Sequence, residues 1–319
     1  MNLVLVAALC LLLLCVVQGG TAAPAPAPGW ALVTPEAAFS IRDTAEGVVF
    51  KDRLWLSNGY YNGNVLTRDL WTSRDGAKWE RVSEATPYDG YSEMVVYRGK
   101  IWAVKGSVWC SDDGLSWTQV LAQTPFGVRG YGELVVHAGE MWQLGSGEDV
   151  WHSRDGKNWV AANAHAPFGS RYASGVAAFA GRLWVMGGAT ERESDPAEKH
   201  YPRFTTFNDV WSSKDGVTWE RVLEHAPWSP RMWFAAHVYA GRLWVLGGFS
   251  NREGANLGDV WSTRDGVHWE QLKAEPTWQP RHEPTCYTYQ GSLWVVAGNC
   301  WPLMNDVWRL TLPAGHAGG

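Results

Sequence analysis

Tryptophan recurs along this chain in three columns, and the spacing of these columns constrains the fold more than any other feature. The chain has 319 residues, of which 22 are Trp and 35 are Gly. Large aromatic residues separated by frequent turn formers favour many short strands over helices. The three columns are Trp55, Trp102, Trp142, Trp184, Trp244 and Trp294; Trp71, Trp109, Trp151, Trp211, Trp261 and Trp308; and Trp79, Trp117, Trp159, Trp219 and Trp269.

The third column has one member fewer than the other two, and the missing member lies at the other end of the chain. Trp117 lies 12 residues before Arg129, and Trp30 lies 12 residues before Arg42. The repeat is therefore circular, because the N-terminal segment completes the last unit.

Each repeat unit has the pattern of four short strands. In the fourth unit, the small apolar segment Val176–Phe179 is followed by a turn at Gly181 and by Leu183–Val185; a D-V-W segment and a W-x-x-V segment come next. Six such units predict an all-β fold, a six-bladed β-propeller of four-stranded blades over residues 30–312. The N-terminal strand Trp30–Val33 is expected to close it by pairing beside residues 306–310.

The segments outside the repeats predict export from the cytosol. Leu3–Val17 is an apolar run followed by small residues, so residues 1–23 are expected to be a signal peptide, residues 24–29 a Pro/Ala linker and residues 313–319 a flexible tail. An uncleaved anchor is the alternative, because the first two residues carry no Lys or Arg. We therefore expect a secreted or otherwise extracytoplasmic protein, extracellular or periplasmic, with no membrane insertion after removal of the signal.

Charge and cysteine content narrow the possible partners. The net charge is −5 and the sequence has no long Lys/Arg cluster, which argues against nucleic acid and against an anionic membrane surface. A monomer is expected. Outside the leader the cysteines are Cys110, Cys286 and Cys300, so at most one internal disulfide can form, with Cys286 and Cys300 the nearer pair.

Two units resemble the kelch repeat. The segment from Pro230-Arg231 through His237 to Gly247-Gly248 has the Pro-Arg pair, small inner strand and aromatic-x-x-Gly-Gly ending of that family, and residues 171–188 match as well. The resemblance extends over residues 30–312, although the Gly-Gly doublet is complete only in these two units and Trp replaces the usual Tyr. It implies a propeller like the central domain of galactose oxidase. The copper site of that enzyme needs two His, two Tyr and a Cys, whereas the nine His here are scattered, so no metal and no cofactor are expected.

The turn between the last two strands of each unit has a second resemblance. Segments such as 73–79 (S-R-D-G-A-K-W) look like a shortened Asp-box, the turn of sialidase-type propellers. An Asp-Gly turn needs positive φ and a side-chain acceptor for backbone N–H groups, so we assign it a structural role.

Arginine and aspartate form two further columns at the end of the repeat where loop lengths vary. The Arg column precedes the first strand and the Asp column precedes the third-strand Trp by two residues; the unit that lacks the Arg also lacks the Asp. This pattern favours ion pairs within blades, while a ring of Arg129, Arg171, Arg231 and Arg281 that binds a carboxylate or sulfate ligand is the alternative. The columns are Arg42, Asp89, Arg129, Arg171, Arg231 and Arg281, and Asp69, Ser107, Asp149, Asp209, Asp259 and Asp306.

Three glutamates on the innermost strands are the first candidates for a functional site. Glu46, Glu93 and Glu133 occupy one column in adjacent units, where the other three units have small residues. Buried like charges raise one another's pKa, so such a trio can serve as general acid and base or bind a hard cation; a solvated channel without a role is the alternative.

Two Trp lie outside every column and are candidates for ligand stacking. They are Trp233 and Trp301, and we expect them beside Tyr201 and Arg203 of the long insert in the fourth unit. The alternative is that these indoles only cover loops.

Together these features predict a secreted, kelch-like module that binds a ligand or a protein at the channel mouth. Carbohydrate or an acidic small molecule is the expected ligand class. The resemblance also implies an enzymatic alternative, a sugar mutarotase or epimerase of the six-bladed kelch type acting on an acidic sugar, with Arg for the carboxylate and Glu for proton transfer.

Overall fold

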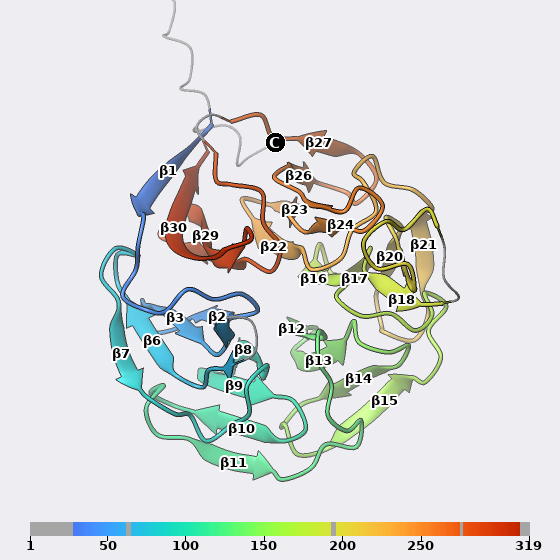
Figure 1. Ribbon diagram of the computed structural model, residues 1–319. Coiled ribbons are helices and arrows are strands. Elements are labelled where there is room, and N and C mark those ends of the chain that lie inside the picture. Colours follow the sequence, from blue (N-terminus) through green and yellow to red (C-terminus); the bar gives the residue numbers. More distant parts are fainter. Residues whose placement is uncertain (1–27, 62–64, 193–195, 275–276, 313–319) are drawn as a thin grey trace, which may run out of the picture.

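Six four-stranded antiparallel sheets surround a central axis in the computed structural model, as Figure 1 shows. The structure describes residues 28–61, 65–192, 196–274 and 277–312. The predicted signal peptide, most of the linker and the predicted tail lie outside the described residues. All described elements are strands, and the described part contains no helix long and apolar enough to cross a membrane. The predicted six-bladed β-propeller is confirmed.

Each blade runs from an innermost strand at the axis to an outermost strand at the periphery (Figure 1). Blade 1 contains β2 (Glu46–Val49), β3 (Leu54–Ser57), β6 (Leu70–Ser73) and β7 (Glu80–Ser83); blade 2 contains β8 (Glu93–Tyr97), β9 (Lys100–Val104), β10 (Val108–Ser111) and β11 (Thr118–Leu121); blade 3 contains β12 (Glu133–His137), β13 (Glu140–Leu144), β14 (Val150–Ser153) and β15 (Trp159–Asn163). Blade 4 contains β16 (Gly175–Phe179), β17 (Arg182–Met186), β20 (Val210–Ser213) and β21 (Glu220–Leu223); blade 5 contains β22 (Ala235–Tyr239), β23 (Arg242–Leu246), β26 (Val260–Thr263) and β27 (Trp269–Gln271); blade 6 contains β28 (Thr285–Tyr289), β29 (Ser292–Asn299), β30 (Leu303–Thr311) and β1 (Gly29–Thr34).

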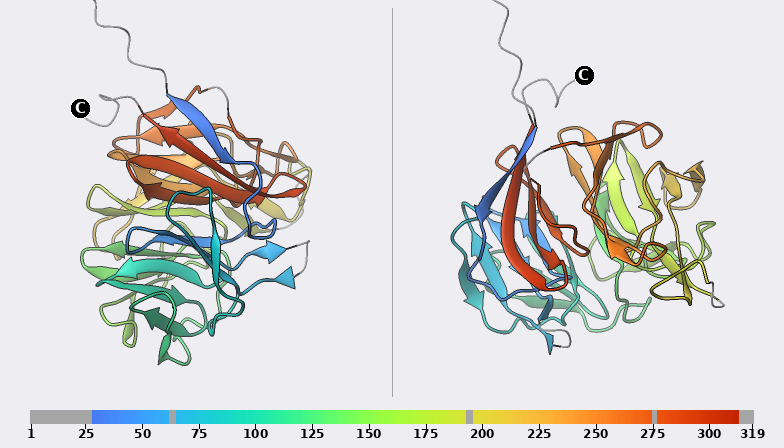
Figure 2. Two further views of the ribbon diagram at one scale, coloured as in Figure 1. Left: turned by 90° about the vertical axis from the view of Figure 1, so that its left-hand side faces the viewer. Right: turned by 45° about the horizontal axis from the view of Figure 1, so that its top comes forward.

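The N-terminal strand closes the ring as the sequence predicts. Strand β1 pairs antiparallel with β30, with Trp30 opposite Leu310 and Leu32 opposite Trp308. Figure 2 shows β1 along the outer edge of the last blade, beside β30. This pairing leaves β30 without a free edge, and it buries Trp30 to 3% exposure.

The Trp column on the second strand of each blade forms the core between blades. Its six indoles are 1% to 6% exposed. In every blade the indole N–H donates to the backbone carbonyl five residues earlier, as Trp184 does to Phe179 at 2.9 Å. A large apolar side chain is thus buried while its single polar atom keeps a partner.

The Asp-Gly turns pack against these indoles, which confirms their structural role. In blade 3, Ser153 Oγ accepts a hydrogen bond from the Gly156 N–H at 2.9 Å, and Asp155 accepts from the two following N–H groups. Gly156 has φ of 72° and lies against Trp102 of the preceding blade. The turn residues of one blade therefore fix its distance from the preceding blade.

Extra hairpins raise one side of the end at which the innermost strands begin. In blades 1, 4 and 5 a two-stranded hairpin connects the second and third strands. In blade 6 the second and third strands, β29 and β30, are themselves longer and extend past this end of the blade. Blades 2 and 3 have only short turns there. The hairpins are β4 (Tyr60–Tyr61) with β5 (Val65–Leu66), β18 (Ala189–Glu191) with β19 (Phe204–Thr206), and β24 (Phe249–Ser250) with β25 (Ala255–Asn256).

Cys286 and Cys300, the nearer pair of cysteines in the sequence, are free thiols in the structure, as is Cys110.

The contact between turn glycine and indole gives a stability prediction. Gly156→Ala places a Cβ 2.2 Å from Trp102, whereas a Cβ added at Gly181, which has nearly the same φ of 71°, meets nothing within 4 Å. We expect Gly181→Ala to cost about 1–2 kcal/mol through backbone strain alone, and Gly156→Ala to cost roughly 1–3 kcal/mol more through overpacking. Equilibrium unfolding in urea measures both, and equal losses would contradict this account of blade spacing.

Candidate functional site

The arginines of the Arg column bind to groups within their own blades. In all five blades that have the Arg, it forms an ion pair with the Asp of the same blade, as Arg171 does with Asp209 at 2.8 Å. The same Asp accepts the indole N–H of the third-strand Trp, and the Arg also donates to the carbonyl at the end of the second strand. Four of these Arg side chains are 0% to 3% exposed.

The geometry thus supports the structural interpretation over a ligand-binding ring. The guanidinium groups of Arg171, Arg231 and Arg281 are enclosed by carboxylate and carbonyl oxygens and lie beside an aromatic ring. Arg129, with 18% of its side chain exposed, pairs with Asp149 in the same way. A ligand carboxylate would have to displace these partners.

Two residues after the Arg column, every blade places a residue with left-handed backbone at the channel mouth. The six φ angles lie between 51° and 64°. Left-handed backbone costs roughly 1–2 kcal/mol for each residue other than glycine, so this strain is concentrated at one place. The six residues are Thr44, Tyr91, Tyr131, Ala173, Trp233 and Glu283.

This column was not singled out from the sequence, because its residues share no chemical type. Four of its members are linked by backbone hydrogen bonds between blades: Ala173 N–H to Tyr131, Trp233 N–H to Ala173 and Glu283 N–H to Trp233, at 2.7 to 3.2 Å. Trp233, which stands outside the Trp columns, is a member of this one. The constant spacing from the Arg column is the signal that identifies it.

Aromatic rings in contact with one another form a belt around part of the mouth. The ring centroids of Tyr91 and Tyr131 are 5.6 Å apart, and those of Tyr131 and Trp233 are 6.2 Å apart. On either side Tyr60 lies 4.9 Å from Tyr91 and His282 lies 5.4 Å from Trp233. Aromatic faces of this kind stack on flat apolar surfaces such as those of sugar rings.

The two Trp outside the columns do lie on the same side of the mouth. His282 lies between them, with ring centroids 5.4 Å from Trp233 and 4.9 Å from Trp301. Tyr201 of the insert lies 5.9 Å from Trp233, while Trp301 is 51% exposed. Arg203, in contrast, forms an ion pair with Glu191 on the exposed hairpin of blade 4.

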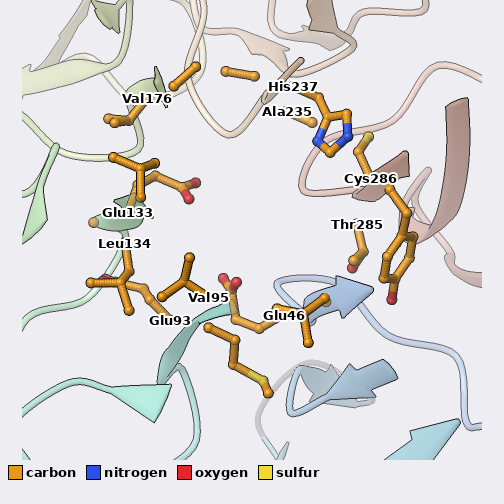
Figure 3. A pocket seen from close by; sticks show the side chains of 18 of the residues that line it. Glu46, Glu93, Val95, Glu133, Leu134, Val176, Ala235, His237, Thr285 and Cys286 are labelled. Carbon is orange, nitrogen blue, oxygen red and sulfur yellow. The ribbon is translucent and has the colours of Figure 1, made fainter. Parts of the chain in front are cut away.

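Deeper in the channel than the aromatic belt, the three candidate glutamates line a cavity of about 520 Å³ along the axis. Figure 3 shows Glu46 and Glu133 extending toward its centre from different blades, with Glu93 beside them. The backbone N–H of Met94 donates to Glu46. Glu283 also lines the cavity, and no Lys or Arg does so among the described residues.

Burial raises the pKa values of these carboxyl groups. It raises the pKa of Glu46 to about 7, and it raises the pKa values of Glu93 and Glu133 well above the usual range, helped by the charge of Glu46. Burial and the nearby Asp43 likewise raise the pKa of Glu283. At neutral pH the cavity therefore offers both hydroxyl donors and carboxyl acceptors.

Several polar atoms around this cavity are buried without a hydrogen-bond partner in the described structure. Buried polar atoms normally have a partner in the protein, a water molecule or a ligand, so these atoms mark groups still to be satisfied. The atoms are Tyr91 Oη, Glu93 Oε2, Trp233 Nε1 and Glu283 Oε1.

Comparison with known proteins supports the architecture. No family model and no curated protein sequence matches the chain. The chain is similar to the solved structure of YjhT, with a TM-score of 0.67 and 12% identity, over 89% of this chain and 98% of that chain. At this identity the similarity shows the fold alone, that of a β-propeller.

The raised pKa of Glu46 predicts how stability depends on pH. Because the folded chain retains a proton that the unfolded chain loses above pH 4.5, this group lowers stability progressively from about pH 4.5 to 7. Glu46→Gln keeps an acceptor for Met94 N–H and has no such proton. We expect it to stabilise the protein by on the order of 1–3 kcal/mol at pH 8 and to have little effect at pH 4.

Thermal and urea unfolding at both pH values measure this difference. The control is Glu84→Gln, because the Glu84 side chain is 82% exposed. A Glu46→Gln variant no more stable than wild type at pH 8 would contradict a buried Glu46 with a raised pKa.

Proposed function

We propose that the protein binds a neutral carbohydrate at the channel mouth. The observation that carries this proposal is the set of unpartnered buried polar atoms of Tyr91, Glu93, Trp233 and Glu283 around one cavity. Sugar hydroxyls both donate and accept hydrogen bonds, so they match protonated carboxyls, a phenol and an indole N–H. The belt of aromatic rings supplies the apolar faces on which a sugar ring stacks.

The sequence left both carbohydrate and an acidic small molecule as ligand classes, and the charge distribution favours a neutral ligand. The cavity is lined by four carboxyl groups and by no Lys or Arg among the described residues. The arginines that would bind a carboxylate are held by aspartates within their blades. An anionic sugar would bring further negative charge beside Glu46 without a cation to compensate it.

The proposal also includes the type of propeller and the place where the protein acts, which are based on the kelch-like motifs and the apolar leader. They support a kelch-type propeller that acts outside the cytosol, where free carbohydrate or glycans are available to a secreted protein.

Binding can be tested with the full chain and a panel of neutral mono- and disaccharides, using calorimetry and saturation-transfer NMR. We expect a neutral sugar to bind more tightly than the corresponding uronic acid. Tyr91→Phe removes an unpartnered hydroxyl of the cavity and should weaken binding between about twofold and tenfold, the usual contribution of one hydrogen bond. Leu115, 61% exposed on the turn between β10 and β11 at the other end of the blade, provides the control variant Leu115→Ala.

Retained affinity in Tyr91→Phe would place the sugar elsewhere. Tighter binding of uronic acids would overturn the preference for a neutral ligand.

Sugar mutarotation is a second candidate, favoured by the pKa of about 7 of Glu46 inside the cavity. Interconversion of anomers needs a base that removes the proton of the anomeric hydroxyl and an acid that protonates the ring oxygen. The ring C–O bond then breaks, the open-chain aldehyde forms, and closure on its other face returns both protons. Glu46 has the pKa of the base, and the neutral Glu93 and Glu133 can supply the acid.

NMR of freshly dissolved α-galactose tests this candidate. We expect the protein to accelerate anomer equilibration, with a rate that rises as pH passes through about 7 because Glu46 must be deprotonated. Glu46→Gln should abolish the acceleration, and Glu84→Gln should retain it. If wild type gives no acceleration while sugar binding is retained, the protein is a binding module only.

A further inference from the structure

Closure of the ring brings together three potential metal ligands at the rim of the mouth. Asp43 precedes the first strand of blade 1, and His282 and Glu283 precede the first strand of blade 6. One donor atom of each lies within 4.8 Å of those of the other two. Asp43 is 6% exposed and His282 is 5% exposed. Within the described part of the chain, no other group of three such residues comes this close.

Neighbouring amides orient two of these ligands. Asn256 Nδ2 donates to the carbonyl of Asn299, so Asn256 Oδ1 faces His282 and accepts the proton of its Nδ1 at 2.7 Å. The lone pair of His282 Nε2 is thereby left free, and the structure records no hydrogen bond to it. Asn299 Nδ2 donates to Asp43 Oδ2 at 2.9 Å. Side chains that bind metals are commonly fixed by partners of this kind.

The carboxylates lack a compensating cation. Neither Asp43 nor Glu283 has an ion pair with any Lys or Arg among the described residues. They share only the hydroxyl of Thr44, which is 2.8 Å from Glu283 Oε2 and 3.1 Å from Asp43 Oδ1 and has one proton to donate. Glu283 Oε1 is buried without a partner. Buried acidic groups of this kind are normally paired or bound to a metal.

We propose that Asp43, His282 and Glu283 bind a divalent transition-metal ion, Zn²⁺ in the first place. One imidazole nitrogen with two carboxylate oxygens is a donor set that suits Zn²⁺, whereas Ca²⁺ and Mg²⁺ prefer oxygen ligands only. Three protein ligands leave a fourth position for a water molecule or a ligand hydroxyl. This inference does not require that the proposed sugar binds, although Glu283 borders both sites.

Other histidines lie beside carboxylates but lack this arrangement. His165 pairs with Glu148 and His268 pairs with Asp265, and these histidine side chains are 83% and 86% exposed. Each of these sites offers two ligands in water. Weak Zn²⁺ binding at these exposed histidines is the background from which Zn²⁺ binding at the rim cluster has to be distinguished.

Calorimetric titration of the chelator-treated full chain, free of any histidine tag, with ZnCl₂ at pH 7.5 tests the proposal. We expect one saturable site per chain. Glu283→Gln preserves the shape and the acceptor for Thr44, and it should weaken Zn²⁺ binding at least about tenfold, as should His282→Gln. Asn256→Ala, which releases the His282 ring, should weaken it about 10–100-fold. Glu84→Gln, at an exposed carboxylate outside the cluster, is the control and should bind as wild type does.

A second readout is the visible absorption of Co²⁺ added in place of Zn²⁺, which should show a protein-bound spectrum in wild type and lose it in Glu283→Gln and Asp43→Asn. Circular dichroism establishes whether each variant is folded. If one of the other rim variants does not fold, Asp43→Asn is used in its place. Absence of saturable Zn²⁺ binding below about 1 mM would overturn the proposal. Equal binding by wild type and the rim variants would do so as well, by assigning the ion to exposed histidines.

Discussion

The rest of the structure depends on the buried pair of Arg and Asp at one end of five blades. In blade 5, Arg231 donates to both oxygens of Asp259, to the carbonyl of Gly247 and to that of Ser229. The same carboxylate accepts the indole N–H of Trp261. One buried guanidinium thus connects the starts of the first and third strands to the end of the second. Removal of one partner from such a buried pair is expected to cost about 3–5 kcal/mol, because the other charge remains uncompensated.

Blade 2 shows what replaces this pair. It has Asp89 and Ser107 in the two columns, and Lys105 Nζ donates to the carbonyl of Gly90 at 2.7 Å while lying over the ring of Tyr91. A single cation therefore still holds the segment that leads into the innermost strand. Trp109 donates to the hydroxyl of Ser107 in place of a carboxylate. The left-handed residue of this blade, Tyr91, is positioned as in the others.

The Arg–Asp pairs of five blades and Lys105 of blade 2 act as anchors, because they fix the segments before the innermost strands. The residues that follow these anchors can therefore adopt strained backbone and face the mouth. The anchors are nearly constant in sequence, whereas the strained column carries Thr, Tyr, Ala, Trp and Glu. Strain of this kind persists only where surrounding structure holds it. The proposed carbohydrate site and the proposed metal site both use this column, the first through Tyr91, Trp233 and Glu283 and the second through Glu283.

The sequence by itself determined the number of blades, their strand order and the closure by Trp30, because each depends on spacing that repeats along the chain. It also identified Glu46, Glu93 and Glu133 as inner residues and paired Arg171 with Asp209, since strict alternation and matching columns report on neighbours within one blade. Only the tertiary structure decided what meets across blades. Asp43 and Asn299 are 256 residues apart and bond only because the ring closes. The left-handed residues that line the mouth were likewise recognised only in the structure, because they share a backbone conformation and not a chemical type.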